Sequence, residues 1–193
     1  MSEAQDPTQM ALQYRWTLYH APPKDKKSRQ AANWSSNHKK VSDMVNVAEF
    51  WSLFNHLVVP SKMRVGSSFF LFKGEVQPEW EDAFNEEGGV WSVSLSKLSP
   101  EKVDQAWLDC VLALIGDQFE HASDIAGVIL AVRRGKTRLD LWTRHASNEE
   151  VCKSIGNELK AFLKIDSSLQ YKAHSTEMNK DLTSGRGYLY ETD

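Results

Sequence analysis

The sequence predicts an α+β protein, and three observations support this class. Residues 15–20 and 91–95 alternate apolar and polar side chains with the period of two that is typical of strands. Three segments, beginning near residues 46, 99 and 147, instead repeat apolar residues every three or four positions, which predicts helices. A continuous apolar run at 127–132 is reversed by a turn that contains Gly135, which predicts a central strand and an antiparallel partner.

The predicted helices have recognisable ends. The first begins at Asn46, which forms a capping box with Glu49, and Pro60 stops it after residue 58. The third begins near Ser147 with a capping box of the same kind. Shorter stretches at 69–73, 171–174 and 188–191 are expected to add further strands.

The second helix is the best specified element. Ser99 can cap it, and Pro100 suits its first position. One apolar row faces inward, and Leu108, Leu112 and Ile115 form a second row beside two aspartates. A helix that is apolar on two sides is either sandwiched between other elements or offers one side to a partner. The sequence leaves both interpretations open.

Composition limits the class of protein. The 193 residues are 41% hydrophobic and 25% charged, which is ordinary for a single globular domain with its own core. The formal net charge of −3 excludes a general polyanion binder, so any contact with nucleic acid should use a small basic patch.

We expect one cytosolic domain over residues 12–193, preceded by a flexible tail at 1–11. The chain contains no apolar run of about eighteen residues and no apolar signal region in its first twenty, so neither a membrane span nor a secretion signal is predicted. Both cysteines, Cys110 and Cys152, fall in helical patterns, which predicts buried, reduced thiols.

A polar loop places an indole and a carboxylate side by side, in Trp80 and Glu81. An indole offers a π-face and a carboxylate offers two acceptors, which together suit a flat, electron-poor ligand with donors on one edge. The alternative is that Trp80 merely anchors its own loop to the core. The chain has seven tryptophans, so some can be spared for a ligand.

The turn of the predicted hairpin is basic, with Arg133 before it and Arg138 after it. Strand alternation places Arg138, Asp140 and Trp142 on one face, which predicts an outward indole near the arginines. Indoles and arginines of this kind suit a nucleotide that is held by stacking and by phosphate contacts.

Enzyme motifs are absent from the sequence. It contains no Gly-x-Ser-x-Gly elbow, no phosphate-binding Gly-x-x-x-x-Gly-Lys loop and no His-Glu-x-x-His zinc helix. The six histidines are scattered, and the two cysteines do not form a metal pair. We therefore expect a binding protein without a metal or another cofactor.

Several motifs follow one another along the chain: Trp34, Asn-Val-Ala-Glu-Phe-Trp-Ser-Leu-Phe-Asn-His at 46–56, Pro-Glu-Trp-Glu-Asp at 78–82, Gly-Gly-x-Trp at 88–91, and Trp-Leu-Asp-x-x-Leu-x-Leu-Ile-Gly at 107–116. With Val132, Arg133 and Trp142, they resemble the eukaryotic translation initiation factor 4E family over roughly residues 12–175. The resemblance implies one strongly curved antiparallel sheet with three helices on its convex face.

The ligand that the resemblance implies is the 7-methylguanosine cap of messenger RNA. It assigns six residues: Trp34 and Trp80 to sandwich the base, Glu81 to accept from its N1 and N2 donors, Trp142 to lie beside the N7 methyl group, and Arg133 and Arg138 to contact the phosphates. Methylation at N7 gives the base a positive charge, which adds a cation–π contribution of about 2 kcal/mol to stacking when the pair is desolvated.

The resemblance also implies a partner, a scaffold factor or a repressor that binds through a Tyr-x-x-x-x-Leu helix followed by an apolar residue. The surface for this helix comprises Val47, Trp51, Leu108, Asp109, Leu112 and Gly116. We expect a monomer that recruits the scaffold for translation initiation. The alternatives are a cap-binding repressor that does not recruit the ribosome and, from another class, a nucleotide or cap hydrolase.

The sequence departs from the family pattern at three places. Val90 stands where a basic residue usually assists the phosphates, and we expect Arg134 and Lys136 to compensate. Met10 and Ala11 replace a His-Pro pair at the partner surface, which allows for a divergent partner motif. The phosphorylatable serine near the C-terminus is missing, so regulation by that route is not expected.

Overall fold

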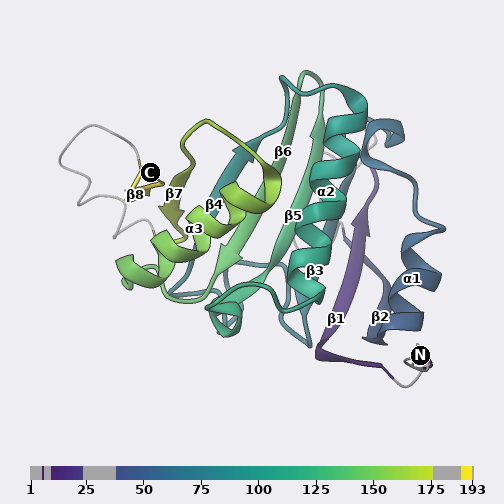
Figure 1. Cartoon of the computed structure of the whole chain (residues 1–193), viewed down its shortest axis with the longest axis horizontal. Helices are drawn as coiled ribbons and strands as arrows, with labels where there is room; N and C mark the ends of the chain where they lie inside the picture. The colour runs from purple at the N-terminus through teal and green to yellow at the C-terminus, as the bar shows by residue number, and fades with distance from the viewer. Residues whose placement is uncertain (1–5, 7–9, 24–37, 176–187, 193) are drawn as a thin grey trace, which may run out of the picture.

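A computed structural model describes residues 6, 10–23, 38–175 and 188–192. Within this part of the chain, eight strands form one sheet in the order β2-β1-β3-β5-β6-β4-β7-β8, and every pairing is antiparallel (Figure 1). The strands are β1 (Ala11–Ala21), β2 (Lys39–Asn46), β3 (Ser68–Lys73), β4 (Gly89–Ser94), β5 (Ile125–Arg133), β6 (Lys136–Thr143), β7 (Gln170–Ala173) and β8 (Tyr190–Glu191).

The α-helices of the described residues lie on one face of this sheet (Figure 1). They are α1 (Val47–Phe54), α2 (Pro100–Ile115) and α3 (Glu149–Leu163), and two short 3-10 helices, η3 (Pro60–Lys62) and η4 (Ala122–Asp124), accompany them. The predicted α+β class, a curved antiparallel sheet with three helices on its convex face, is confirmed. β5 lies near the centre of the sheet, between β3 and β6, as its continuous apolar sequence predicted.

The main core fills the space between the helices and the convex face. Trp16, Leu139 and Leu141 point into it and are fully buried. A smaller cluster, which includes Phe72 and Trp142, lies on the opposite, concave face. The strands therefore bury apolar side chains on both faces, and among the described residues the helices lie on the convex face alone.

Helix α1 starts as predicted but ends earlier than predicted. Asn46 Oδ1 accepts from the backbone N–H of Glu49 at 2.8 Å, which confirms the cap of α1. The Glu49 carboxylate accepts from Val45 N–H at 2.8 Å, one residue before the cap, rather than from the N–H of Asn46 as in a regular capping box. The predicted end at residue 58 is wrong, because α1 stops at Phe54. Val59 is extended, as a residue before proline prefers, and the chain leaves the helix before it reaches this position.

The other two helices differ in how well their starts were predicted. Ser99 Oγ accepts from Lys102 N–H and caps α2, as expected. The cap of α3 is Asn148 rather than Ser147, and its side chain accepts from Val151 N–H at 3.3 Å. Asparagine is as good a cap as serine, and Glu149 and Glu150 lie in the first turn, where the helix dipole favours acids.

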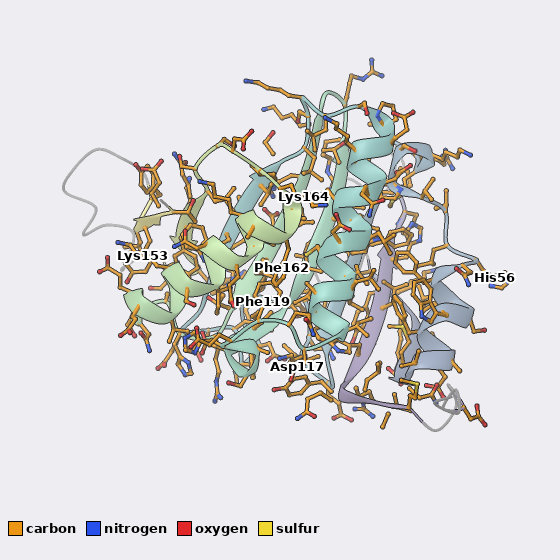
Figure 2. All side chains as sticks on the ribbon, in the orientation of Figure 1. His56, Asp117, Phe119, Lys153, Phe162 and Lys164 are labelled. Atoms are coloured by element: carbon orange, nitrogen blue, oxygen red, sulfur yellow. The ribbon has the colours of Figure 1, made fainter. Side chains whose placement is uncertain are left out.

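Helices α2 and α3 are joined by an aromatic contact. Phe119, just after α2, packs against Phe162 of α3 with ring centroids 5.0 Å apart at 73°, and Figure 2 shows the two side by side. Asp117 and Lys164, at the ends of these helices, adopt the left-handed conformation with φ near 53° and 52°. Both cysteines are free and buried, as predicted. No helix among the described residues is long and apolar enough to cross a membrane.

Lys73 is a buried cation at the end of β3. Its side chain donates to the carbonyl oxygen of Ala122, and Nζ lies 3.7 Å from the centroid of the Tyr14 ring. Burial lowers the pKa of Lys73 from its usual 10.5 to about 8. Between these two values the unfolded chain binds more protons at this lysine than the folded chain does.

The free energy of unfolding should therefore rise with pH in the wild type relative to Lys73→Met, by roughly 2–3 kcal/mol between about pH 8 and 10. Denaturant unfolding of both proteins across this interval measures the difference. The exposed Lys97→Met is the control. Parallel curves for wild type and Lys73→Met would contradict the buried-lysine account.

Candidate functional site

The loop over residues 74–88 joins β3 to β4 and presents Trp80. The Trp80 side chain is 54% exposed, so the interpretation that it anchors its loop to the core is wrong. Asp82 instead braces this loop, because its carboxylate accepts from the backbone N–H groups of Gln77 at 3.0 Å and Phe84 at 2.9 Å. Glu81, the neighbouring acid, is exposed. Of the two adjacent carboxylates, one therefore holds the loop and the other faces solvent beside the indole.

Asn85 is the second brace of the loop, and the sequence analysis missed it. The side chain is fully buried, and Nδ2 donates to the carbonyl oxygens of Gln77 and Glu79 at 2.8 Å each. These bonds fix the backbone on both sides of Pro78, just before Trp80. An asparagine in a polar loop has no distinctive sequence pattern, so only the fold reveals this role.

The start of β2 lies against the same loop. His38 Nε2 is 3.9 Å from Glu79 Oε1, and the imidazole packs edge-on to Tyr19 with centroids 5.4 Å apart. Burial lowers the pKa of His38, which opposes an ion pair with Glu79. Trp34 lies outside the described residues, four positions before His38 in the sequence.

The concave face contains a hollow of about 1050 Å³. Val90, Trp142 and His174 line one end of it, and the β5–β6 hairpin lines the other with Arg133 and Arg138. Arg138 and Trp142 lie on the same face of β6, four residues apart, which corresponds to about 13 Å along a strand. The hollow thus has an aromatic end, beside the point where the Trp80 loop enters β4, and a cationic end.

Trp142 lies on the predicted face, but the expectation of an outward indole is wrong, because its exposed fraction is only 8%. Phe72 packs against it edge-to-face at 5.6 Å, and the ring of His174 lies 4.2 Å away. Phe72 and Trp142 lie on either side of Gly127 in the strand register, and the missing side chain of this glycine lets the two rings meet. Burial lowers the pKa of His174 to about 4, so the ring beside Trp142 is neutral near pH 7.

The two arginines of the hairpin are each held by the protein. Arg133 Nη1 donates to the carbonyl oxygens of Ser67 at 2.8 Å and Val132 at 3.0 Å, and its Nη2 donates to Ser68 Oγ at 3.0 Å. Burial, and then the charge of Arg138, lower the pKa of Arg133. Arg138 donates through Nε to Asp140 Oδ2 at 2.8 Å.

Lys172 is a further cation that the sequence analysis missed. It pairs directly with Val90 across β4 and β7, and its side chain lines the hollow. It therefore places a positive charge next to Val90. Lys136 also lines the hollow, whereas Arg134, which was expected to compensate with it, does not. The register of two strands that are distant in sequence decides this neighbour, so local patterns could not identify Lys172.

The convex face carries the predicted partner surface. Trp51 on α1 is 39% exposed and Leu112 on α2 is 37% exposed, which is unusual for large apolar side chains. Beneath these two residues, Phe54 of α1 and Trp107 of α2 line a small apolar void of about 10 Å³ in the core. Ile115, which was predicted to belong to the outer row, is buried.

The remaining members of this surface are Val47, Leu108 and Asp109, which are partly buried, and Gly116, which is exposed at the end of α2. Met10 reaches the same area, since its carbonyl oxygen accepts from Val47 N–H at 3.0 Å. The outer row of α2 is therefore short, with Leu108 and Leu112 as its apolar members.

Comparison with known proteins gives consistent matches. The family model described as "Eukaryotic initiation factor 4E" matches residues 11–187. The eukaryotic translation initiation factor 4E1 of Drosophila melanogaster is 36% identical over 167 residues, which are 86% of this chain and 62% of that protein. The chain thus spans less than two thirds of this relative.

Two solved structures are similar throughout. The Ascaris suum eIF4E-3 complex with m7G cap has a TM-score of 0.80 at 34% identity, covering 88% of this chain and 93% of that chain. The schistosome eIF4E complexed with m7GpppG and 4E-BP has a TM-score of 0.82 at 26% identity, covering 94% and 98%.

Asn85→Asp should loosen the Trp80 loop. The substitution keeps the size of the side chain but removes both amide donors and points a carboxylate at two carbonyl oxygens, which should cost about 2–4 kcal/mol of unfolding free energy. Denaturant unfolding and hydrogen exchange of the amides at 77–88 measure the effect. Glu86→Gln, at an exposed position of the same loop, is the control. Unchanged exchange in Asn85→Asp would contradict this role.

Proposed function

Because the chain belongs to the eukaryotic initiation factor 4E family, we propose that it binds the 7-methylguanosine cap of messenger RNA and recruits a scaffold factor for translation initiation. The observation that carries the proposal is the exposed Trp80 and Glu81 pair on a braced loop. This loop leads into β4, and Val90 of that strand lines the hollow. The Ascaris and schistosome proteins that share this fold were solved with cap ligands, which supports the same ligand class here.

The base is proposed to stack between Trp80 and Trp34. The contact between His38 and Glu79 supports this pairing, because each of these residues lies close in sequence to one of the indoles. Positive charge on the methylated base strengthens both stacking faces through cation–π attraction. Glu81 is proposed to accept from the N1 and N2 donors of guanine, at roughly 1.5–3 kcal/mol for each charged hydrogen bond.

The phosphates are proposed to follow β6 from the aromatic end toward the hairpin. Trp142 then lies near the N7 methyl group, and Arg133 and Arg138 meet the phosphates. Both arginines are already restrained by hydrogen bonds, so little side-chain freedom is lost when phosphate binds. Lys172 adds a charge next to Val90, where the family has a basic residue.

The partner surface on α1 and α2 is proposed to receive a short amphipathic helix with a Tyr-x-x-x-x-Leu motif and a following apolar residue. Trp51 and Leu112 supply exposed apolar anchors on neighbouring helices. We place this activity in the cytoplasm and ascribe it to binding alone, without catalysis.

The first test concerns the base. Trp80→Ala should weaken binding of 7-methylguanosine triphosphate by about 2–4 kcal/mol, because a stacking face and its cation–π contribution vanish together. Glu81→Gln should reduce the ratio of the affinity for methylated guanine nucleotide to that for unmethylated guanine nucleotide. Isothermal titration with both nucleotides measures these effects. A folded Trp80→Ala that binds like the wild type would overturn the assignment.

The second test concerns the partner surface. Trp51→Ala should weaken a peptide with the Tyr-x-x-x-x-Leu motif by about 2 kcal/mol or more, while cap affinity stays within about twofold. Trp80→Ala is the reciprocal control, since it should lose the cap and keep the peptide. Titration of each protein with each ligand decides the matter, and equal peptide affinity for Trp51→Ala and wild type would exclude this surface.

A further inference from the structure

Asp140 is the only carboxylate among the described residues that line the hollow. The other charged side chains there are cations: Arg133, Lys136, Arg138 and Lys172. Asp140 lies in the middle of β6 and only 5% of it is exposed. An acid in this position is unexpected on charge alone, because a phosphate ligand must pass close to it.

Each oxygen of the Asp140 carboxylate accepts a hydrogen bond. Ser92, directly opposite it on β4, donates from Oγ to Asp140 Oδ1 at 2.7 Å, and Arg138 donates from Nε to Oδ2 at 2.8 Å. Burial raises the pKa of Asp140 above its usual value, and the two donors oppose this rise because they favour the ionised carboxylate. The bond uses one of the five donor hydrogens of Arg138, and the Arg138 side chain remains 58% exposed toward the hollow.

We propose that Asp140 determines how strongly the hollow distinguishes long phosphate chains from short ones, by acting as an internal counter-charge to Arg138. This inference rests on the proposed function in so far as the natural ligand carries a chain of phosphates. A phosphate at Arg138 shares that cation with Asp140 and meets the carboxylate's charge. The repulsion grows with each phosphate that the ligand adds.

Asp140 has a second effect, which is separable from the first. By fixing Nε it orients the guanidinium of Arg138, and this helps every ligand that reaches Arg138 by a similar amount. The charge effect instead scales with the number of phosphates. The ratio of triphosphate to monophosphate affinity therefore isolates the counter-charge, while the absolute affinities contain both effects.

Asp140→Asn removes the charge and keeps the shape. Titration with 7-methylguanosine monophosphate and triphosphate should give an affinity ratio about threefold to tenfold larger in this variant than in the wild type. Asp104→Asn is the matched control, because Asp104 is an acid on α2 that bonds to Ser61, on the helix-bearing side of the sheet. It changes the net charge equally and should leave the ratio unchanged. A ratio that is unchanged or smaller in Asp140→Asn overturns the inference.

The role of Arg138 is tested in the same assay. In Arg138→Gln the carboxylate loses its cation, so adding Asp140→Asn should recover part of the lost triphosphate affinity. No recovery would mean that Asp140 does not act as a counter-charge at this position. Thermal unfolding confirms that each variant is folded, and Asp140→Ser replaces Asp140→Asn if the latter is not.

Inorganic pyrophosphate and tripolyphosphate separate this inference from the proposed function, because they lack a base. If cap analogues do not bind but Asp140→Asn shifts the preference toward tripolyphosphate, the proposed function fails and the inference stands. A second outcome is that methylated cap analogues bind while Asp140→Asn changes neither the ratio of triphosphate to monophosphate affinity nor the ratio of tripolyphosphate to pyrophosphate affinity. In that case the inference fails and the proposed function stands. A wild type that binds neither cap analogue nor tripolyphosphate overturns both.

Discussion

The packing of α3 on the buried indole of Trp91 positions the strand that forms one wall of the hollow. Trp91 Nε1 donates to the carbonyl oxygen of Cys152 at 2.9 Å, and its ring lies 5.2 Å from Tyr171. A Cβ at Gly156 would come within 2.6 Å of the indole, so glycine is what allows the helix to approach this closely. Trp91 and Gly156 therefore hold β4 against α3. Because side chains alternate along a strand, Val90, the neighbour of Trp91, points to the opposite face and lines the hollow.

The same alternation gives the two faces of the sheet different roles, one in the core and one in the hollow. Along β6, Leu139 and Leu141 enter the core below the helices, whereas Arg138, Asp140 and Trp142 line the hollow. The candidate ligand site and the partner surface thus share a scaffold but no side chain. Either site can change its residues without repacking the other, which is the physical basis for expecting their binding energies to be nearly independent.

Features that depend on neighbours in sequence were predictable, and those that depend on the register between distant strands were not. The caps at Asn46 and Ser99 and the hairpin turn follow from local hydrogen bonding, and the structure confirms them. The burial of Trp142 instead depends on strand register, because Gly127 of β5 lies between Phe72 and Trp142 and has no side chain to separate the two rings, and on His174, which follows β7. Lys172 lies beside Val90 because of a pairing across eighty residues of chain. The assigned role of Trp34 stays a prediction, since it lies outside the described residues.

The two ends of the hollow differ in how they are held, and this suggests how they divide recognition. Strands β5 and β6 carry the arginines, and hydrogen bonds to Ser67 and Asp140 restrain them before any ligand arrives. Trp80 lies on a loop. Hydrogen bonds made by Asp82 and Asn85 fix the loop backbone, while the Trp80 ring stays exposed. A rigid cationic end can bind phosphate with little loss of side-chain conformational entropy, but it does not distinguish one base from another. Discrimination among bases must then come from the loop end, where a braced backbone lets the indole close on a ligand without reorganising the strands beneath it.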